Sequence, residues 1–261
     1  MNLQTYLDFA TSLAYRAGKI TLKHFNTGVH VNIKENNDPV TAADHDAENF
    51  IRSEIEREYP GHAIVGEEFG ASNGAASSFR WTIDPIDGTK SFIRSVPLYG
   101  VLIGLEIEGV IRVGAAYYPP LDEMLCAADG LGCCWNGRRA HVSEVSEMSH
   151  ACVVTSDFQR LAEKDSTLVD RFAKKKALLR TWGDAYGYLL VATGRAEVCI
   201  DPFLDIWDYG PYPVILREAG GFFGTWSGEE GHTSGDALAC NAALKSEVLE
   251  LLRGSSSTEN Q

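Results

Sequence analysis

The sequence has few basic residues for its length. Its 261 residues include 23 Lys and Arg against 36 Asp and Glu, which gives a formal net charge of −13. A field of that sign repels polyanions at long range, so we expect no nucleic-acid partner. The densest basic run, Lys174–Lys176, is typical of one solvated turn of a helix. An anionic substrate would therefore need metal ions to mediate its binding.

Long apolar runs are also absent. No stretch approaches the ~18 apolar residues of a membrane-spanning helix, so we expect no membrane partner. The first residues, MNLQTYLDFATSLAYRAG, lack the basic and continuously apolar segments of a signal peptide. The six cysteines include no C-x-x-C pair and no histidines at zinc-finger spacing, so we interpret them as reduced thiols. These observations predict a cytoplasmic protein.

Hydrophobic periodicity predicts an N-terminal α+β half over residues 1–150. Apolar residues recur at three- and four-residue steps up to about Phe25 and again from Thr41 to Tyr59, which indicates two helices. A loop over Lys34–Pro39 separates them, and a second loop is expected over 70–78. The residues Glu108-Gly109 indicate a hairpin. The expected strands are 63–65, 80–83, 100–107, 110–117 and 131–135.

Strands and helices alternate after residue 150, which predicts a C-terminal α/β half over residues 151–253. The expected strands are 152–155, 178–180, 196–200 and 237–240. The expected helices are 168–176, 185–193, 207–219 and 242–252. Residues 254–261 are polar, and we expect them to form a disordered tail.

Four acidic segments lie where the expected elements meet loops. They are Asp38–Asp44, Gly66–Glu68, Asp84–Thr89 and Trp207-Asp208. The third segment follows an apolar strand, and its Pro85 and Gly88 allow the chain to bend so that Asp84 and Asp87 converge. Backbone N–H groups that follow Gly88 are suited to a phosphate oxygen.

Oxygen ligands of this kind favour a hard cation. Carboxylates that converge with a backbone carbonyl, here that of Ile86, suit Mg²⁺. These segments contain no His or Cys, which argues against zinc. Two divalent ions about 4 Å apart would clamp a phosphoryl group and lower the pKa of a bound water.

Each segment also has a plainer interpretation. The composition of Asp84–Thr89 is that of an ordinary turn. The spacing of Thr41 and Asp44 fits a capping box, and Asp208 fits the N-cap of the helix that follows it. Glu67 and its neighbour would then be surface charge. Because all four segments occur in one chain, each at an element junction, the metal site is favoured.

Three signatures of the sequence resemble those of the inositol-monophosphatase-like, metal-dependent, lithium-sensitive phosphatases. The signatures are Gly66–Glu68, Asp84-Pro-Ile-Asp-Gly-Thr89 and Trp207-Asp208 through Glu218-Ala-Gly-Gly221. The resemblance extends from the first helix to about Leu252. One departure is Gly210-Pro211, where inositol-type enzymes usually carry small residues such as Ala-Gly. The resemblance implies an α/β fold, a five-layered αβαβα sandwich, with Mg²⁺ catalysis and usually a homodimer.

The resemblance also implies roles by position. The implied ligands of two or three Mg²⁺ ions, for which Mn²⁺ would substitute, are Glu67, Asp84, Asp87, Asp208, the Ile86 carbonyl and Thr89. Asp44 would orient Thr89, and Thr89 together with Glu67 would activate the attacking water. Gly88 and Thr89 would cradle the phosphate.

Two further stretches resemble the histidinol-phosphatase subgroup. Inositol-type enzymes have a segment similar to Gly-Ser-Ala-Ala where this chain has Arg180-Thr-Trp-Gly-Asp184. They also tend to have Glu at the position of Asp201, the first residue of Asp201-Pro-Phe-Leu-Asp205. Extra carboxylates beside a phosphate site favour a cationic leaving group, and histidinol carries an ammonium and an imidazole, whereas inositol carries only hydroxyls. Asp184 also fits the N-cap of the next helix, and Asp205 fits a solvated surface.

We therefore predict an enzyme that hydrolyses a small-molecule phosphate ester by attack of a metal-activated water. Histidinol phosphate, an intermediate of histidine biosynthesis, is the first candidate substrate. The alternative is inositol-1-phosphate or another sugar or nucleotide phosphate. A non-enzymatic relative is disfavoured, because every expected metal position is filled. The candidate substrate-binding residues are Gly88, Thr89, Arg180, Asp184, Asp201 and Asp205.

Overall fold

The structure is a computed structural model that describes residues 2–28, 31–33, 39–72, 77–231 and 235–254. The expected loop from Lys34 to Asp38, part of the loop at 70–78 and the expected disordered tail from residue 255 lie outside these ranges. No helix within the described ranges is long and apolar enough to cross a membrane.

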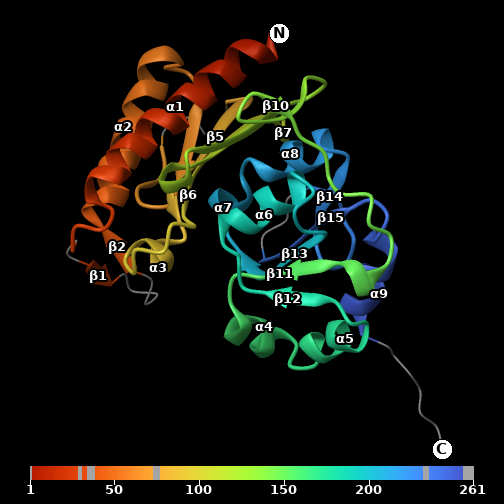
Figure 1. The fold of residues 1–261 in the computed structure, drawn as a ribbon. Coiled ribbons are helices and arrows are strands. Elements are labelled where there is room, and N and C mark those ends of the chain that lie inside the picture. Colours follow the sequence, from red (N-terminus) through yellow and green to blue (C-terminus); the bar gives the residue numbers. More distant parts are fainter. Residues whose placement is uncertain (1, 29–30, 34–38, 73–76, 232–234, 255–261) are drawn as a thin grey trace, which may run out of the picture.

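The N-terminal half is a sheet of eight strands with two helices on one face (Figure 1). The helices are α1 (Leu3–His24) and α2 (Ala42–Glu58), close to their predicted bounds. The sheet, in spatial order, contains β10 (Arg138–Arg139), β9 (Gly132–Trp135), β8 (Glu123–Ala128), β7 (Val110–Tyr118), β6 (Gly100–Ile107), β5 (Phe79–Asp87), β3 (Ala63–Gly66) and β4 (Gly70–Ala71). Strand β3 is parallel to β5, and all other pairs in this sheet are antiparallel.

Side chains of β6 alternate between two cores, because successive residues of a strand point to opposite faces of the sheet. Val101 and Ile103 pack against α1 and α2, whereas Leu102 packs on the opposite face. Both faces of this sheet are therefore covered, which explains the continuous apolar run that predicted the strand. Two short elements complete this half: a ribbon of β1 (Val31–Ile33) with β2 (Pro39–Thr41), and the single turn α3 (Thr89–Phe92).

The C-terminal half has a second sheet of five strands. In spatial order these are β12 (Leu178–Arg180), β11 (Cys152–Val154), β13 (Val198–Leu204), β15 (Gly235–Asn241) and β14 (Gly221–Gly224). Its helices are α4 (Phe158–Lys164), α5 (Leu168–Lys174), α6 (Ala185–Ala192), α7 (Ile206–Tyr209), α8 (Tyr212–Glu218) and α9 (Lys245–Arg253). Single 3₁₀ turns occur at Pro119–Leu121 and Met148–His150.

The layers of the two halves stack into one sandwich (Figure 1). Helices α6 and α8 lie between the two sheets and share a core with both, while α5 and α9 cover the outer face of the small sheet. Residues of α6 are buried on all sides apart from Tyr186, as expected for a helix in a central layer. The predicted five-layered αβαβα sandwich is confirmed.

One predicted helix is wrong in an informative way. The pattern over 207–219 predicted a single helix, but α7 and α8 are separate and meet at Gly210-Pro211. Proline lacks an N–H and clashes with the carbonyl four residues earlier, so α7 cannot continue through Pro211.

The strand predicted at 80–83 is also too short, since β5 extends to Asp87 with a register irregularity between Asp84 and Asp87. Strands β8 and β14 and helix α4 were not predicted.

Candidate active site

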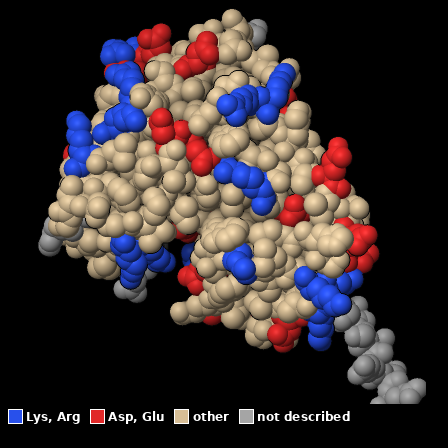
Figure 2. Space-filling view, viewed as in Figure 1, with Lys and Arg blue, Asp and Glu red and all other residues tan. Residues whose placement is uncertain are grey.

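A cavity of about 700 Å³ lies between the two halves of the chain, and it receives residues from both. Figure 2 shows the surface notched between the two halves on the side of α3 and α4. The carboxylic side chains that line the cavity are Glu67, Asp84, Asp87, Asp184, Asp201, Asp205 and Asp208. Lys90 and Arg160 are the cationic side chains in its lining. Residues far apart in the sequence therefore meet at one strongly acidic site.

The end of β5 forms one wall of this cavity. Asp84 is buried, and its Oδ1 accepts a hydrogen bond of 2.9 Å from the Ile86 N–H. Gly88 has a φ of +93°, a left-handed conformation that favours glycine, and α3 begins directly after it. The Thr89 hydroxyl donates to the Ile86 carbonyl at 3.0 Å. The segment is thus more than an ordinary turn, because it folds Asp84, Asp87 and the Ile86 carbonyl around one bend.

Glu67 reaches the cavity from the turn between β3 and β4. Its backbone N–H donates to the Ile83 carbonyl at 3.2 Å, which fastens this turn to β5. The surface-charge interpretation is wrong for the neighbouring Glu68, whose side chain is 3 % exposed and lies 3.5 Å from His45 Nε2. Strands β3 and β5 are adjacent, so Glu67 comes beside Asp84 although a loop separates them in sequence.

Asp208 comes from the other half of the chain, in the short helix α7. Asp205, not Asp208, is the N-cap of α7, and the Asp208 carboxylate accepts the Asp205 N–H at 2.7 Å. The segment approaches the large sheet very closely: a Cβ on Gly104 would lie 2.5 Å from the Gly210 carbonyl oxygen. A Cβ on Gly210 would in turn collide with the Thr82 hydroxyl. Glycine at both positions therefore lets Asp208 approach the end of β5.

Burial and mutual repulsion define the electrostatics of the site. Burial raises the pKa of Asp84 well above its ordinary value, and the charges of Glu67, Asp87 and Asp208 add to this. Burial, followed by the charge of Asp208, raises the pKa of Asp87 in the same way. Burial is also the main reason that the pKa of Asp208 rises to about 8. Carboxylates in this situation gain greatly from a neutralising cation.

The donor chemistry suits hard divalent cations, since it consists of carboxylates and one backbone carbonyl. Glu67, Asp84, Asp87, Asp208 and the Ile86 carbonyl would hold the ions. The carboxylates do not close around one point: within the described residues, no three His, Cys, Asp or Glu side chains already form a group that could hold an ion.

Asp44 lies behind the cavity rather than in its lining. The predicted capping box is confirmed: Asp44 Oδ2 accepts the Thr41 N–H at 2.8 Å and the Thr41 hydroxyl at 2.7 Å. Asp44 Oδ1 is buried and has no hydrogen-bond partner among the described residues. Burial is the main cause that raises the pKa of Asp44, and the charge of Glu67 contributes. The hydroxyl of Thr89 is directed to Ile86, so the structure does not show the expected contact between Asp44 and Thr89.

Asp184 faces the bend at Gly88 and the start of α3 from the C-terminal half. It occupies the N-cap position of α6, as the alternative interpretation expects, but its side chain makes no capping hydrogen bond. Instead its carboxylate accepts the Ser91 hydroxyl at 3.1 Å, and Oδ2 would lie 3.2 Å from a Cβ on Gly88. Burial, with the charge of Asp201, raises the pKa of Asp184 to about 6.

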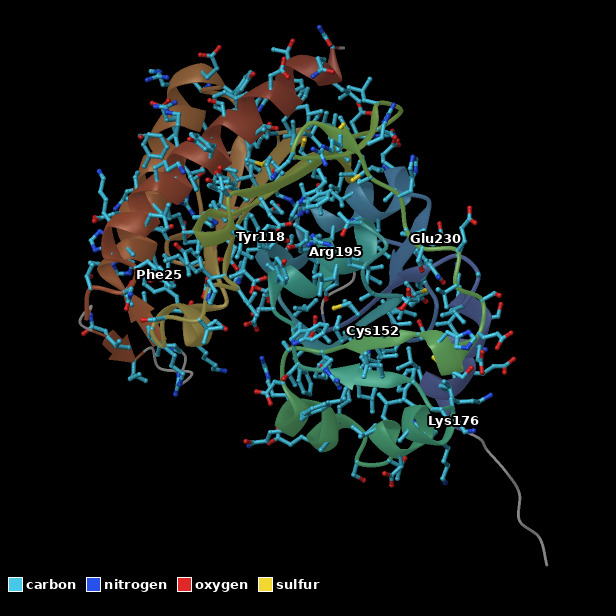
Figure 3. The ribbon with its side chains drawn as sticks, viewed as in Figure 1. Phe25, Tyr118, Cys152, Lys176, Arg195 and Glu230 are labelled. Atoms are coloured by element: carbon cyan, nitrogen blue, oxygen red, sulfur yellow. The ribbon has the colours of Figure 1, made fainter. Side chains whose placement is uncertain are left out.

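The backbone at Asp184 is strained, with φ +50° and ψ −155°. Such a conformation in a residue other than glycine costs about 1–3 kcal/mol and persists only where the surroundings impose it. The hydroxyls of Tyr118 and Tyr212 both donate to the next carbonyl, that of Ala185, at 2.8 and 3.1 Å. Tyr118 lies on β7 facing the central helices (Figure 3). These contacts hold Asp184 toward the cavity.

The remaining predicted substrate residues have three different settings. Asp201 is buried, and its carboxylate accepts hydrogen bonds from the Ser156 N–H and hydroxyl and from the Tyr188 hydroxyl. Asp205 is exposed and also lines the cavity, so the structure is compatible both with a solvated surface residue and with a substrate-binding residue. Arg180 does not line the cavity: it ends β12, donates to the Leu179 carbonyl and lies 5.8 Å from the Trp182 ring.

Some lining residues were not among the predicted ones. Lys90 directly follows Thr89, so its position in the sequence was a usable signal. Ser156 and Arg160 flank the start of α4, a helix that hydrophobic periodicity did not reveal. Another residue, Glu48 of α2, lies outside the lining but bonds to the turn that carries Glu67.

Comparison with known proteins gives consistent matches over nearly the whole chain. A model described as the inositol monophosphatase family matches residues 2–257. A histidinol-phosphatase of Chlorobaculum parvum is 41% identical, covering 89% of this chain and 90% of that protein. One from Mycobacterium tuberculosis is 35% identical, covering 94% and 97% respectively. The solved structure of an inositol monophosphatase from Anabaena (Nostoc) sp. PCC 7120 is 30% identical, with a TM-score of 0.85 and 97% of each chain covered.

Proposed function

We propose a substrate for this chain on one premise: it belongs to the inositol monophosphatase family, and it is a phosphoric monoester hydrolase. The proposed substrate is histidinol phosphate, and the proposed cofactor is Mg²⁺, two or three ions in each site. The family is metal-dependent, and the oxygen-only donor set of the cavity supports Mg²⁺ with Mn²⁺ as a substitute.

The chain's own residues divide the work of hydrolysis between the two halves. Bound divalent ions would supply Lewis-acid charge at the phosphoryl oxygens and lower the pKa of the attacking water. Gly88 and Thr89 hold the phosphate at the bend after β5, and the nearby charges of Lys90 and Arg160 attract it. We assign the Glu67 carboxylate, with the Thr89 hydroxyl, to orient the water and to accept its proton.

The observation that carries the choice of substrate is the position of Asp184. The half-buried Asp184 carboxylate lies against Gly88, and the Ser91 hydroxyl is its only hydrogen-bond donor among the described residues. It can therefore still accept a bond from a cationic group of the ester that occupies the phosphate cradle. Histidinol offers an ammonium and an imidazole, and inositol offers neither. Names of relatives support the same choice, since three histidinol-phosphatases match at 35–41% identity.

Phosphate release from three esters tests the proposal. Histidinol phosphate, inositol-1-phosphate and 3′-phosphoadenosine 5′-phosphate are compared at saturating Mg²⁺, and kcat/KM should be highest for the first. Equal kcat/KM for histidinol phosphate and inositol-1-phosphate would refute the substrate but not the enzyme class. Full activity after exhaustive chelation would refute the metal.

We also infer a cytoplasmic homodimer. All six cysteines are free thiols, which supports a reducing compartment. The dimer is inferred from family membership. Sedimentation equilibrium at micromolar concentration should give twice the chain mass of 28.5 kDa, and a monomer mass would contradict the inference.

A further inference from the structure

Helix α2 carries a charged stripe on its buried side. Asp44, Glu48 and Arg52 follow one another at four-residue steps, so they lie on one face of the helix. All three side chains are buried, and Glu48 has no exposed surface at all. Charged residues are almost never fully buried unless they are paired, so this stripe requires an explanation.

The Glu48 carboxylate is bonded to the turn that contains Glu67. Its Oε2 accepts the Glu68 N–H at 2.8 Å, and its Oε1 accepts the Phe69 N–H at 3.3 Å. Arg52 pairs with the same carboxylate, its Nε lying 2.7 Å from Oε1. The Arg52 guanidinium also donates to the Gly70 carbonyl, at the end of the same turn. Two side chains of α2 thus hold three consecutive residues that follow Glu67.

The residue before Glu67 is fitted to the same carboxylate. Gly66 lies so close to Glu48 that a Cβ at this position would collide with Oε1 and with the Arg52 guanidinium. On its other side, the Glu67 N–H is bonded to the Ile83 carbonyl of β5. The backbone of Glu67 is therefore fixed from both sides, by β5 and by the buried pair on α2.

We propose that Glu48 is a positioning residue that directs the Glu67 carboxylate toward the divalent cation. The inference rests on the proposed function, which assigns Glu67 as a cation ligand. A role in stability alone would not require these bonds, because a buried ion pair is often replaceable by apolar side chains without loss of stability. Partners that orient metal ligands typically contribute about 10–100-fold to metal affinity or activity.

The test compares three variants with the unchanged protein by titration calorimetry with Mn²⁺ in the absence of substrate. Glu48→Gln removes the charge and one acceptor from the turn, and Glu67→Gln removes the assigned ligand. Glu54→Gln is the matched control: Glu54 lies on the same helix and is also buried, but it pairs with Arg16 and Arg57 and does not contact the turn. Thermal unfolding of each variant is recorded in parallel.

We expect Glu48→Gln to weaken Mn²⁺ binding about 10–100-fold, whereas Glu54→Gln lowers the melting temperature and leaves the affinity within twofold. Affinity within twofold of the unchanged protein in folded Glu48→Gln would overturn the inference and leave the proposed function intact. Unchanged affinity in Glu67→Gln would instead refute Glu67 as a ligand.

If Glu48→Gln does not fold, a second variant at the same position, Glu48→Asp, tests the proposal instead. Glu48→Asp keeps the charge beside Arg52 but shortens the side chain by one methylene, so the carboxylate withdraws from the Glu68 and Phe69 N–H groups. It should fold and should show the same loss of Mn²⁺ affinity. If neither variant gives a cooperative unfolding transition, Glu48 is a requirement of the fold, and the inference is overturned.

Discussion

Replacement of Asp184 by Asn tests the structural basis of substrate choice most directly. The change removes one negative charge from the cavity and keeps the size of the side chain. Asn still accepts a hydrogen bond from the Ser91 hydroxyl, and it adopts a positive φ more readily than most residues. Helix α6 loses no cap, because the Asp184 side chain does not cap it. We therefore expect little change in stability.

The magnitude follows from the kind of bond that is lost. A hydrogen bond to a charged partner is worth roughly 1.5–3 kcal/mol, which corresponds to about 10- to 150-fold in kcat/KM. This applies to histidinol phosphate, whose cationic group would lose its charged partner. Inositol-1-phosphate has no such group, so its kcat/KM should change less than about threefold, a difference of roughly 0.6 kcal/mol.

The assay is phosphate release from both esters at saturating Mg²⁺, with Asp157→Asn as the control. Asp157 is the N-cap of α4 and accepts the N–H groups of Gln159 and Arg160. Asn caps a helix as well as Asp does, so this control removes an equal charge nearby without loss of structure. Equal losses for both esters in Asp184→Asn, or a similar selective loss in the control, would refute the assignment of Asp184.

Three further predictions concern the metal site and its support. Asp84→Asn should nearly abolish turnover while the far-ultraviolet circular dichroism stays unchanged, because it removes the negative charge of a buried carboxylate that is a proposed cation ligand; substantial residual kcat would contradict this role. Asp44→Asn should lower kcat by about 10²–10⁴-fold with little change in KM if Asp44 assists proton transfer. If the same variant instead loses about 1 kcal/mol of unfolding free energy and keeps its kcat, Asp44 acts only as a helix-capping residue. Gly104→Ala should destabilise the protein by about 1–3 kcal/mol and weaken Mn²⁺ binding, because the added methyl group displaces the segment of Asp208. Gly61→Ala, where a Cβ meets nothing within 4 Å, should do neither in the same unfolding and calorimetry experiments.

Elements with a strong hydrophobic period could be predicted from the sequence. Helix α1 and strand β6 have nearly their predicted bounds, because each buries a continuous apolar face that the sequence displays. Helix α4 was not predicted, since it is only seven residues long and buries only Leu161. Short elements of this kind depend on tertiary contacts, and their sequence carries too little periodicity to identify them.

Site residues could be predicted where the chain itself brings them together. Asp84, Asp87 and Gly88 lie on one bend, so the turn-forming residues of this segment were enough to predict that the two carboxylates converge. Arg180 is a candidate because the stretch from Arg180 to Asp184 resembles the histidinol-phosphatase subgroup, but β12 places Arg180 at the edge of the small sheet, outside the cavity lining. Glu48 is not among the predicted site residues. Its four-residue spacing to Asp44 and Arg52 places all three charged side chains on one buried face of α2, and this spacing could have indicated a structural or functional role.

The proposed acidic ligands come from both halves of the chain, so their geometry depends on the packing between the halves. Glu67, Asp84 and Asp87 are placed by the large sheet, whereas Asp208 belongs to the segment between β13 and α8. These parts meet where the backbone at Gly210-Pro211 packs directly on Gly104 and Gly114 of the large sheet, with no space for a side chain between them. Packed interiors are nearly incompressible, so a side chain added at this contact would push the segment that carries Asp208 away from Asp84. The distance between Asp208 and the carboxylates of the large sheet therefore depends on backbone packing between the halves, which hydrophobic periodicity does not reveal.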